Sequence, residues 1–148
     1  MKQKLSIAFF VILVAVSQFL SVASAGDKKP LVLRKIMQDM GENMQSITDG
    51  ISREDWELVK SRARLIAEHP KPPFGEKLRI LSFVGTDTRK FKKLDEKTHD
   101  AAVILEQAAT EQDGAAVIQS FFHLQNSCLE CHQKFRKPFL QKFYDQNP

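Results

Sequence analysis

The sequence predicts an all-α protein, an antiparallel up-down-up-down four-helix bundle. Apolar residues recur at alternating steps of three and four in four separate stretches, which is the spacing of helices that bury one face. No stretch shows the sustained alternation that is typical of strands. The intervals between the stretches are short or moderate, and such connections favour antiparallel neighbours around a shared core.

Residues 1–25 have the three features of a signal peptide. These features are the basic residues Lys2 and Lys4, the apolar run 5–20, and the small residues Ala23 and Ala25 of a cleavage site. The alternative is an uncleaved membrane anchor, because the apolar run approaches the ~20 residues of a spanning helix. We expect export, cleavage, and a single domain over residues 26–148, since a chain of this size supports one core.

The charge of the mature chain is nearly balanced. Without Lys2 and Lys4, 20 Lys and Arg residues remain against 18 Asp and Glu residues, which gives no reason to expect a nucleic-acid partner. Basic residues gather near the carboxyl end, at Lys134, Arg136, Lys137 and Lys142. They form either a solvated helix face or a docking patch for an acidic redox partner.

The first helix is expected over residues 30–48 and the second over residues 52–69. Pro30 suits a first helical turn, and Gly50 suits the stop of the first helix. Ser52 followed by Asp55 resembles a capping box. The apolar stripes of the two helices are Leu33, Met37, Met40, Met44 and Ile47, and then Trp56, Val59, Ala63 and Ile66.

Residues 70–86 are expected to form a long connection with no more than a short helical turn, because Pro and Gly residues interrupt regular structure there. The third helix is expected over residues 87–109, where alanines on the apolar stripe indicate a close helix contact. The fourth helix follows Asp113-Gly114. Its stripe consists of Val117, Phe121, Leu124, Cys128, Cys131 and Phe135, so both cysteines of the chain lie on it.

The segment Cys128-Leu129-Glu130-Cys131-His132 has the pattern of covalent haem attachment. Haem c needs two thiols that reach two vinyl groups at one edge of the porphyrin, and an imidazole that reaches the iron. A helical turn places two cysteines at this spacing side by side and directs the next residue toward the ring centre. We therefore expect one haem c on Cys128 and Cys131, with His132 as an iron ligand.

Four alternatives compete with haem. A structural zinc site takes four ligands, and His69, His99 and His123 provide no closely spaced second pair. A thioredoxin-like redox pair normally lies at a helix start beside a strand, and a structural disulfide over so short a loop stabilises little. The last alternative is a bundle without a cofactor. No set of serine, histidine and carboxylate indicates catalysis, so we do not expect an enzyme.

Export, four helical stretches and a Cys-x-x-Cys-His motif near the carboxyl terminus together resemble the class II cytochromes c, the cytochrome c′ family. The resemblance covers the mature chain and is strongest from Cys128 to Arg136. Phe135 departs from it, since the family usually has Tyr there. The resemblance implies a periplasmic four-helix bundle with haem in the core, and redox proteins, nitric oxide or carbon monoxide as partners. Dimers are common in the family, so a homodimer is a second possible state.

Members of this family differ in what the first helix presents to the second face of the iron. A methionine there suits electron transfer, whereas a non-coordinating side chain leaves the iron open to nitric oxide or carbon monoxide. Similarity to methionine-ligated members over residues 40–44 implies Met37 as the ligand, with Met40, Met44 or an open face as alternatives. The favoured function is single-electron transfer, and gas binding is the second hypothesis.

Basic side chains near the motif have two interpretations. Arg136, one turn after His132, either contacts a haem propionate and keeps this side of the haem electropositive, or lies on the surface without a role. Arg34 and Lys35 are further candidates for a propionate contact. His69, His99 and His123 are expected to be surface or hydrogen-bonded histidines rather than iron ligands.

Overall fold

The computed structural model describes residues 30–144, so the predicted signal peptide lies outside the described residues. The elements are α2 (Val32–Ser52), α3 (Trp56–Ala67), α4 (Phe74–Val84), the 3₁₀ turn η2 (Gly85–Asp87), α5 (Thr88–Thr110) and α6 (Gly114–Tyr144). The described chain has no β-strand, and the predicted all-α four-helix bundle is confirmed. No described helix combines the length and the apolar character that would let it cross a membrane.

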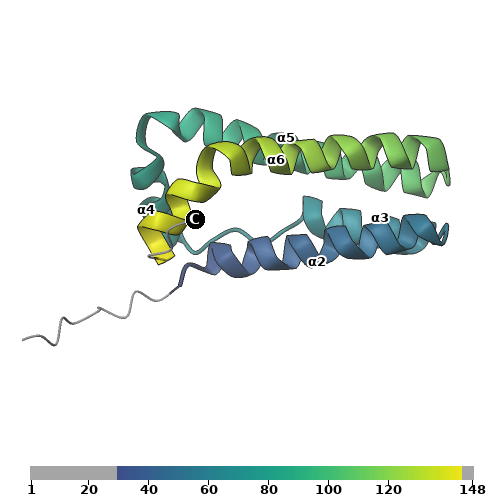
Figure 1. Ribbon diagram of the computed structural model, residues 1–148, viewed down its shortest axis with the longest axis horizontal. Helices are drawn as coiled ribbons and strands as arrows, with labels where there is room; N and C mark the ends of the chain where they lie inside the picture. Colours follow the sequence, from purple (N-terminus) through teal and green to yellow (C-terminus); the bar gives the residue numbers. More distant parts are fainter. Residues whose placement is uncertain (1–29, 145–148) are drawn as a thin grey trace, which may run out of the picture.

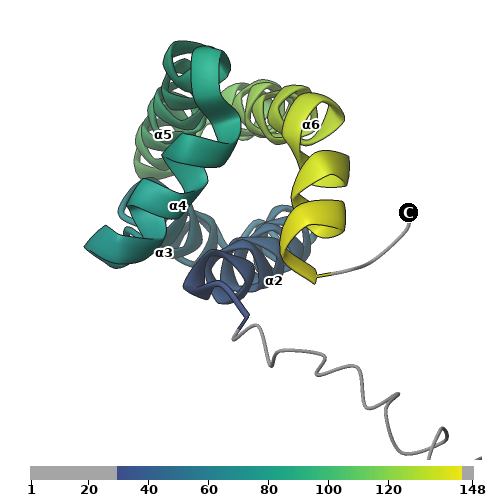
Figure 2. The same cartoon turned by 90° about the vertical axis from the view of Figure 1, so that its left-hand side faces the viewer.

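The bundle consists of α2, α3, α5 and α6, and α4 lies across one end of it (Figures 1 and 2). Helix α5 packs along both α3 and α6, and α3 packs along α2, whereas α2 and α6 share few close contacts. We call the two ends of the bundle the α4 half and the turn half. The α4 half contains residues 30–39, 68–96 and 131–144, and the turn half contains residues 40–67 and 98–127, including the tight turns after α2 and α5.

Apart from Ile36 of α2, the buried apolar side chains of the described residues form two separate clusters, one in each half. The turn-half cluster consists of Ile47, Val59, Ala63, Ile66, Ala67, Ala101, Ala102, Leu105, Ala108, Ala109, Val117 and Leu124. The α4-half cluster consists of Leu31, Ile80, Leu94, Phe135, Phe139 and Phe143. Alanines of α3 and α5 meet in the first cluster, as the sequence indicates. The core of the bundle is therefore interrupted between the two halves.

The turn between α2 and α3 corrects two predictions. Gly50 lies inside α2 rather than at its stop, because α3 approaches there: a Cβ at Gly50 would lie 2.9 Å from Cγ2 of Val59. Ser52 is the last residue of α2, and its hydroxyl donates to the carbonyl of Thr48 over 2.9 Å. The cap of α3 is Asp55, whose Oδ1 accepts from the amide of Leu58 at 3.0 Å.

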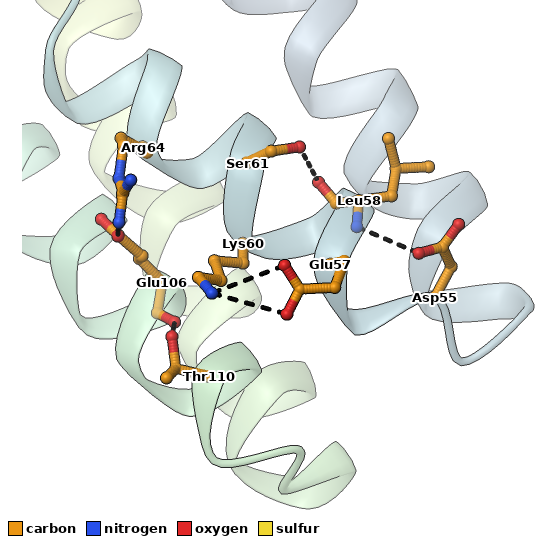
Figure 3. A network of polar contacts seen from close by, with 8 residues as sticks. All are labelled: Asp55, Glu57, Leu58, Lys60, Ser61, Arg64, Glu106 and Thr110. Atoms are coloured by element: carbon orange, nitrogen blue, oxygen red, sulfur yellow. Dashed lines mark hydrogen bonds and ion pairs between the residues drawn. The ribbon is translucent and has the colours of Figure 1, made fainter.

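Polar side chains on the surface of the turn half join α3 to its neighbour α5 (Figure 3). Arg64 of α3 donates through Nε to Oε1 of Glu106 of α5 at 2.8 Å, and Lys60 lies 3.4 Å from the carboxylate of Glu57 on its own helix. Such pairs at the surface contribute little to stability because water screens them. The alanine contact beneath them is what holds α3 against α5.

Helix α4 was not expected, since residues 70–86 were predicted to be a connection with no more than a short helical turn. The proline and glycine residues stand at its boundaries: Pro73 is the N-cap and Gly85, with φ of 59°, ends it. Between them, Ile80 is buried in the α4-half cluster and Phe83 packs against it. Tertiary packing of this face stabilises the helix, although the proline and glycine residues of the segment predicted an irregular connection.

Glu76 attaches α4 to the start of α2. Its Oε2 accepts from the amide of Val32 at 2.7 Å and its Oε1 accepts from the amide of Leu33 at 2.8 Å. The N-cap residue of α2, Leu31, gives no side-chain cap, so these amides have no local acceptor. A carboxylate at the positive end of a helix dipole makes strong, charge-assisted hydrogen bonds.

We predict that Glu76→Ala lowers the free energy of unfolding by about 1–2 kcal/mol, because α2 loses its only side-chain cap among the described residues. Urea unfolding followed by circular dichroism measures this. The control is Glu96→Ala, an exposed glutamate of α5, which should change stability by less than about 0.5 kcal/mol. Equal effects of the two substitutions would contradict the capping role.

Candidate functional site

The Cys-x-x-Cys-His motif lies on α6 where the core is interrupted. Leu124 of α6 belongs to the turn-half cluster and Phe135 belongs to the α4-half cluster. Cys128, Cys131 and His132 lie between these two residues, and Cys131 packs against the α4-half cluster. Both cysteines are half-buried and carry free thiols. The motif therefore lies at the level where the two clusters do not meet, and the side chain of His132 is exposed there.

Helix α2 crosses the same interruption with Met37. Leu33 packs against the α4-half cluster, whereas Met40 and Met44 pack against the turn-half cluster. Met37 lies between them on the same helical stripe, yet its side chain belongs to neither cluster and is 39% exposed. Among the three methionines predicted as candidates, Met37 is the one whose thioether is not engaged in core packing.

The residues around this interruption fit haem c. The group needs two neighbouring thiols, an imidazole, and apolar side chains from facing helices of a bundle. Two thiols and the imidazole come from α6, and α2 faces them with few direct contacts. Phe91 of α5 and Phe135 of α6, whose ring centroids are 5.2 Å apart, supply apolar surface just beyond Cys131.

The thiols are not arranged as a redox-active pair. Burial raises the pKa of Cys128, and burial followed by the charges of Asp95 and Cys128 raises the pKa of Cys131 to about 11. Thioredoxin-like pairs have a lowered thiol pKa at a helix start, whereas these cysteines lie deep within a helix of 31 residues. The two cysteines therefore have neither the helix-start position nor the lowered thiol pKa of a thioredoxin-like pair.

The imidazole of His132 favours its neutral form. Partial burial lowers its pKa, and the positive charge of Arg136, one turn further along α6, lowers it again. A metal ion binds the neutral ring, so this environment suits a ligand. Arg136 is exposed and forms no ion pair with a described carboxylate. Its guanidinium is thus available beside His132.

The other basic candidates are engaged elsewhere. The guanidinium of Arg34 lies 5.2 Å from the ring centroid of Tyr144, and Lys35 pairs with Asp39 on α2. Lys134 pairs with Asp87 over 2.7 Å, which joins α6 to η2. Arg34 and Lys35 therefore each have a partner among the described residues, whereas Arg136 has no ion-pair partner there.

The remaining histidines have protein partners or face solvent. Nδ1 of His99 lies 2.9 Å from the carbonyl oxygen of Ala67, and that of His69 lies 3.0 Å from the carbonyl of Pro70. A carbonyl only accepts, so each Nδ1 carries a proton. His123 is exposed on α6. Across residues 30–144 no three His, Cys, Asp or Glu side chains are grouped so as to bind a metal ion, whereas structural zinc takes four ligands.

Asp95 is a neighbour of the motif that the sequence did not reveal. Its carboxylate lies 3.5 Å from Nε2 of His69, and its charge acts on Cys131. Hydrogen bonding to Asp95 is the main cause that raises the pKa of His69, and hydrogen bonding to His69 is the main cause that lowers the pKa of Asp95. The two residues are 26 positions apart, so no local sequence signal pairs them.

A family model described as Cytochrome C' matches residues 33–136. The matched segment is most of the described bundle and includes Met37, the Cys-x-x-Cys-His motif and Arg136. No curated protein matches the chain significantly.

The His69–Asp95 pair predicts a pH dependence of stability. The raised pKa of His69 adds stability below pH ~6.5 that is lost as the pH rises through the folded-state pKa, whereas the lowered pKa of Asp95 adds stability above pH ~4 that is lost on acidification. The pair should therefore stabilise most between about pH 4 and pH 6.5. Because Asp95 is 60% exposed, we expect a contribution below about 1 kcal/mol.

Urea unfolding at pH 6 and pH 9 measures this contribution. Asp95→Asn should reduce the stability lost between the two pH values, whereas Asp100→Asn, an exposed aspartate of the same helix, should leave the loss unchanged. An unaltered pH dependence in Asp95→Asn would refute the role of the pair.

Proposed function

The chain belongs to the cytochrome c′ family, and we propose that it is an exported, periplasmic monohaem c-type cytochrome that carries single electrons. The observation that supports the proposal most directly is the position of Cys128, Cys131 and His132 on α6, between the two clusters of buried apolar side chains. Redox proteins are the partners that this function requires. The function needs no enzymatic activity of the chain.

In this proposal the residues of α6 hold the cofactor. Cys128 and Cys131 would hold one haem through thioethers, and His132 would ligate the iron from the same helix. Bound haem supplies a one-electron couple whose potential depends on the axial ligands and on burial. Before attachment, the raised pKa of both thiols keeps them protonated at neutral pH, and the lowered pKa of His132 keeps its ring available for the metal. Arg136 would place a positive charge near the haem propionates or the proximal ring.

We assign the second axial position to Met37. Met40 and Met44 pack against the turn-half cluster. Met37 lies on the same helical stripe but belongs to neither cluster, so its thioether is available to a ligand. A thioether ligand raises the potential and yields low-spin iron suited to electron transfer. A protein built in this way changes its coordination little between oxidation states, which favours rapid transfer.

Binding of nitric oxide or carbon monoxide is the second candidate function, and it fits the family at least as well. The observation in its favour is the loose contact between α2 and α6. A side chain that is 39% exposed on a helix with few contacts to its neighbour offers little resistance to displacement by a gas. The two candidates share the residues of α6 and differ only at Met37.

We predict that the reduced protein, made in a host that attaches haem c, has a low-spin optical spectrum that carbon monoxide leaves unchanged. Met37→Ala should convert it to a high-spin, gas-sensitive spectrum. The control Met44→Ala should keep the low-spin spectrum and lose about 2–4 kcal/mol of stability, as a partly buried core methionine does. A wild-type spectrum that shifts with carbon monoxide would favour the gas-binding function instead.

Attachment through the two cysteines has a separate test. The double variant Cys128→Ala, Cys131→Ala should contain no haem after denaturation, whereas His132→Ala should retain covalent haem at reduced yield and lose its native spectrum, because thioether bonds do not need the iron ligand. Mass spectrometry of the denatured chains distinguishes the two. Covalent haem on the double variant, or none on the wild type, would disprove the proposed attachment.

A further inference from the structure

Helix α6 has a second stripe of residues beside the one that it buries, and we call it the outer stripe. Residues three and four positions apart lie on one face of a helix, and the outer stripe repeats these steps one position after each residue of the buried stripe. All its members are exposed, and α6 meets α2 at few points, which leaves this face open. They are Ala115, Ile118, Phe122, Gln125, Leu129, His132 and Arg136.

The middle of the outer stripe is apolar and carries no charge. Ile118, Phe122 and Leu129 are 61%, 60% and 52% exposed. Residues 114–129 contain no Asp, Glu, Lys or Arg, although these types make up 27% of the whole chain. Single exposed apolar residues are ordinary on a soluble protein, but an aligned row of them without charges is typical of the centre of an interface.

Charges of opposite sign lie at the two ends of the outer stripe. The turn that precedes α6 contains Glu111 and Asp113, and both are exposed. At the other end, Arg136 belongs to the stripe and Lys137 follows it, and both are exposed as well. Glu130, the one acidic residue within α6, is paired with Lys97 of α5 at 2.7 Å. The stripe therefore has an acidic end, an apolar middle and a basic end.

Two copies of the outer stripe complement each other when their α6 helices are antiparallel. With a two-fold axis level with the midpoint between Phe122 and Gln125, Ile118 of one copy is level with Leu129 of the other, and Ala115 is level with His132. The acidic turn of each copy then lies beside the basic end of the other. A parallel arrangement would place the acidic turns together and the basic ends together, which like-charge repulsion opposes.

We propose that the outer stripe is the interface of a homodimer in which the two α6 helices pack antiparallel. Steps of three and four are the spacing with which two helices pack side by side, and a two-fold axis makes every contact twice. The dimer would bring Ala115 of the second copy to the level of His132, so each copy would contact the other beside the motif. The proposal goes beyond the electron-carrier function and does not rest on it, because the apolar residues that support it hold no cofactor.

The size of the stripe sets the expected strength of the dimer. From Ala115 to Arg136 it is about 32 Å long, since each residue of a helix adds about 1.5 Å. Stable interfaces bury about 800 Å² on each partner, which is more than one helix face of this length provides. We therefore expect a dimer that dissociates at micromolar concentrations.

Other occupants fit the outer stripe less well. An anionic membrane surface binds apolar side chains that have Lys or Arg beside them, whereas residues 114–129 contain neither. An unrelated protein would have to match the apolar middle and both charged ends in reverse order. A second copy of the chain supplies this match from the same residues.

The first experiment is sedimentation velocity of the full haem-loaded protein across micromolar concentrations. Ile118→Glu, Phe122→Glu should raise the dissociation constant of the dimer at least about tenfold, because each side chain occupies the centre of the interface. The control is Phe74→Glu, Leu78→Glu, a pair on α4 that is 75% and 52% exposed, and it should change the constant less than about twofold.

Circular dichroism establishes that both variants fold, and Ile118→Gln, Phe122→Gln repeats the test without added charge. A wild type that stays monomeric, or equal weakening by both pairs, would overturn the proposal. A monomer that binds phosphatidylglycerol vesicles through Ile118 and Phe122 would assign the stripe to a membrane and overturn it too. If no haem is attached, the electron-carrier function fails, yet sedimentation still tests the dimer.

The second experiment tests the antiparallel arrangement with a short bismaleimide crosslinker. Gln125 and Gln133 are both exposed on α6. In the proposed dimer the two copies of residue 125 are about 5 Å apart along the helices, and those of residue 133 are about 29 Å apart. Gln125→Cys should therefore form crosslinked dimers at least about tenfold more than Gln133→Cys. Equal crosslinking at the two positions would overturn the antiparallel interface.

Discussion

The structure depends on a core that is interrupted between two apolar clusters. Interrupted cores cost dispersion energy and burial, so a bundle tolerates one only where another group completes the packing. Helix α6 crosses the interruption without a break, from Leu124 in one cluster to Phe135 in the other, and the cysteines and His132 lie between. Helix α6 thus joins the two clusters and also carries the residues of the candidate site. The packing of the clusters on either side determines where the motif lies in the bundle.

The two helices on either side of this interruption are held together mainly at the α4 end. Direct contact between α2 and α6 is sparse, but the start of α2 is fixed by the carboxylate of Glu76 and by Arg34, which lies over the ring of Tyr144 at the end of α6. Helix α4 is therefore more than a connection: by capping α2 and burying Ile80 it closes the open end of the bundle. This arrangement leaves little direct contact between α2 and α6 while it keeps their relative height fixed, which is what a cofactor held by one helix and facing another would require.

Periodicity predicted the four long helices well because a buried stripe is repeated every turn and records the fold locally. It failed where the role of a residue depends on contact with another helix. Gly50 was expected to end a helix, but it allows α3 to approach α2, and the prolines and glycines around α4 mark its ends rather than its absence. The motif on α6 was recognised because its chemistry requires adjacent residues. Glu76 and Asp95 were not, because their partners are 26 to 44 positions away.

In the proposed site, the choice between electron transfer and gas binding would be made by α2 rather than by α6. Every residue that would attach the haem lies on α6, and these residues serve both functions equally. A thioether remains on the iron only if the helix that carries it is held at a fixed distance, and α2 is held at its start and along α3 rather than along α6. Met37 lies barely more than one turn beyond the amides that Glu76 accepts, within the part of α2 that this carboxylate stabilises. In the proposed site, the cap on α2 and the exposure of Met37 would therefore act against each other: the cap would keep the thioether in place, and the exposure would make it replaceable. Which of the two prevails is a property of the first helix and its attachment, and the haem-binding motif carries no information about it.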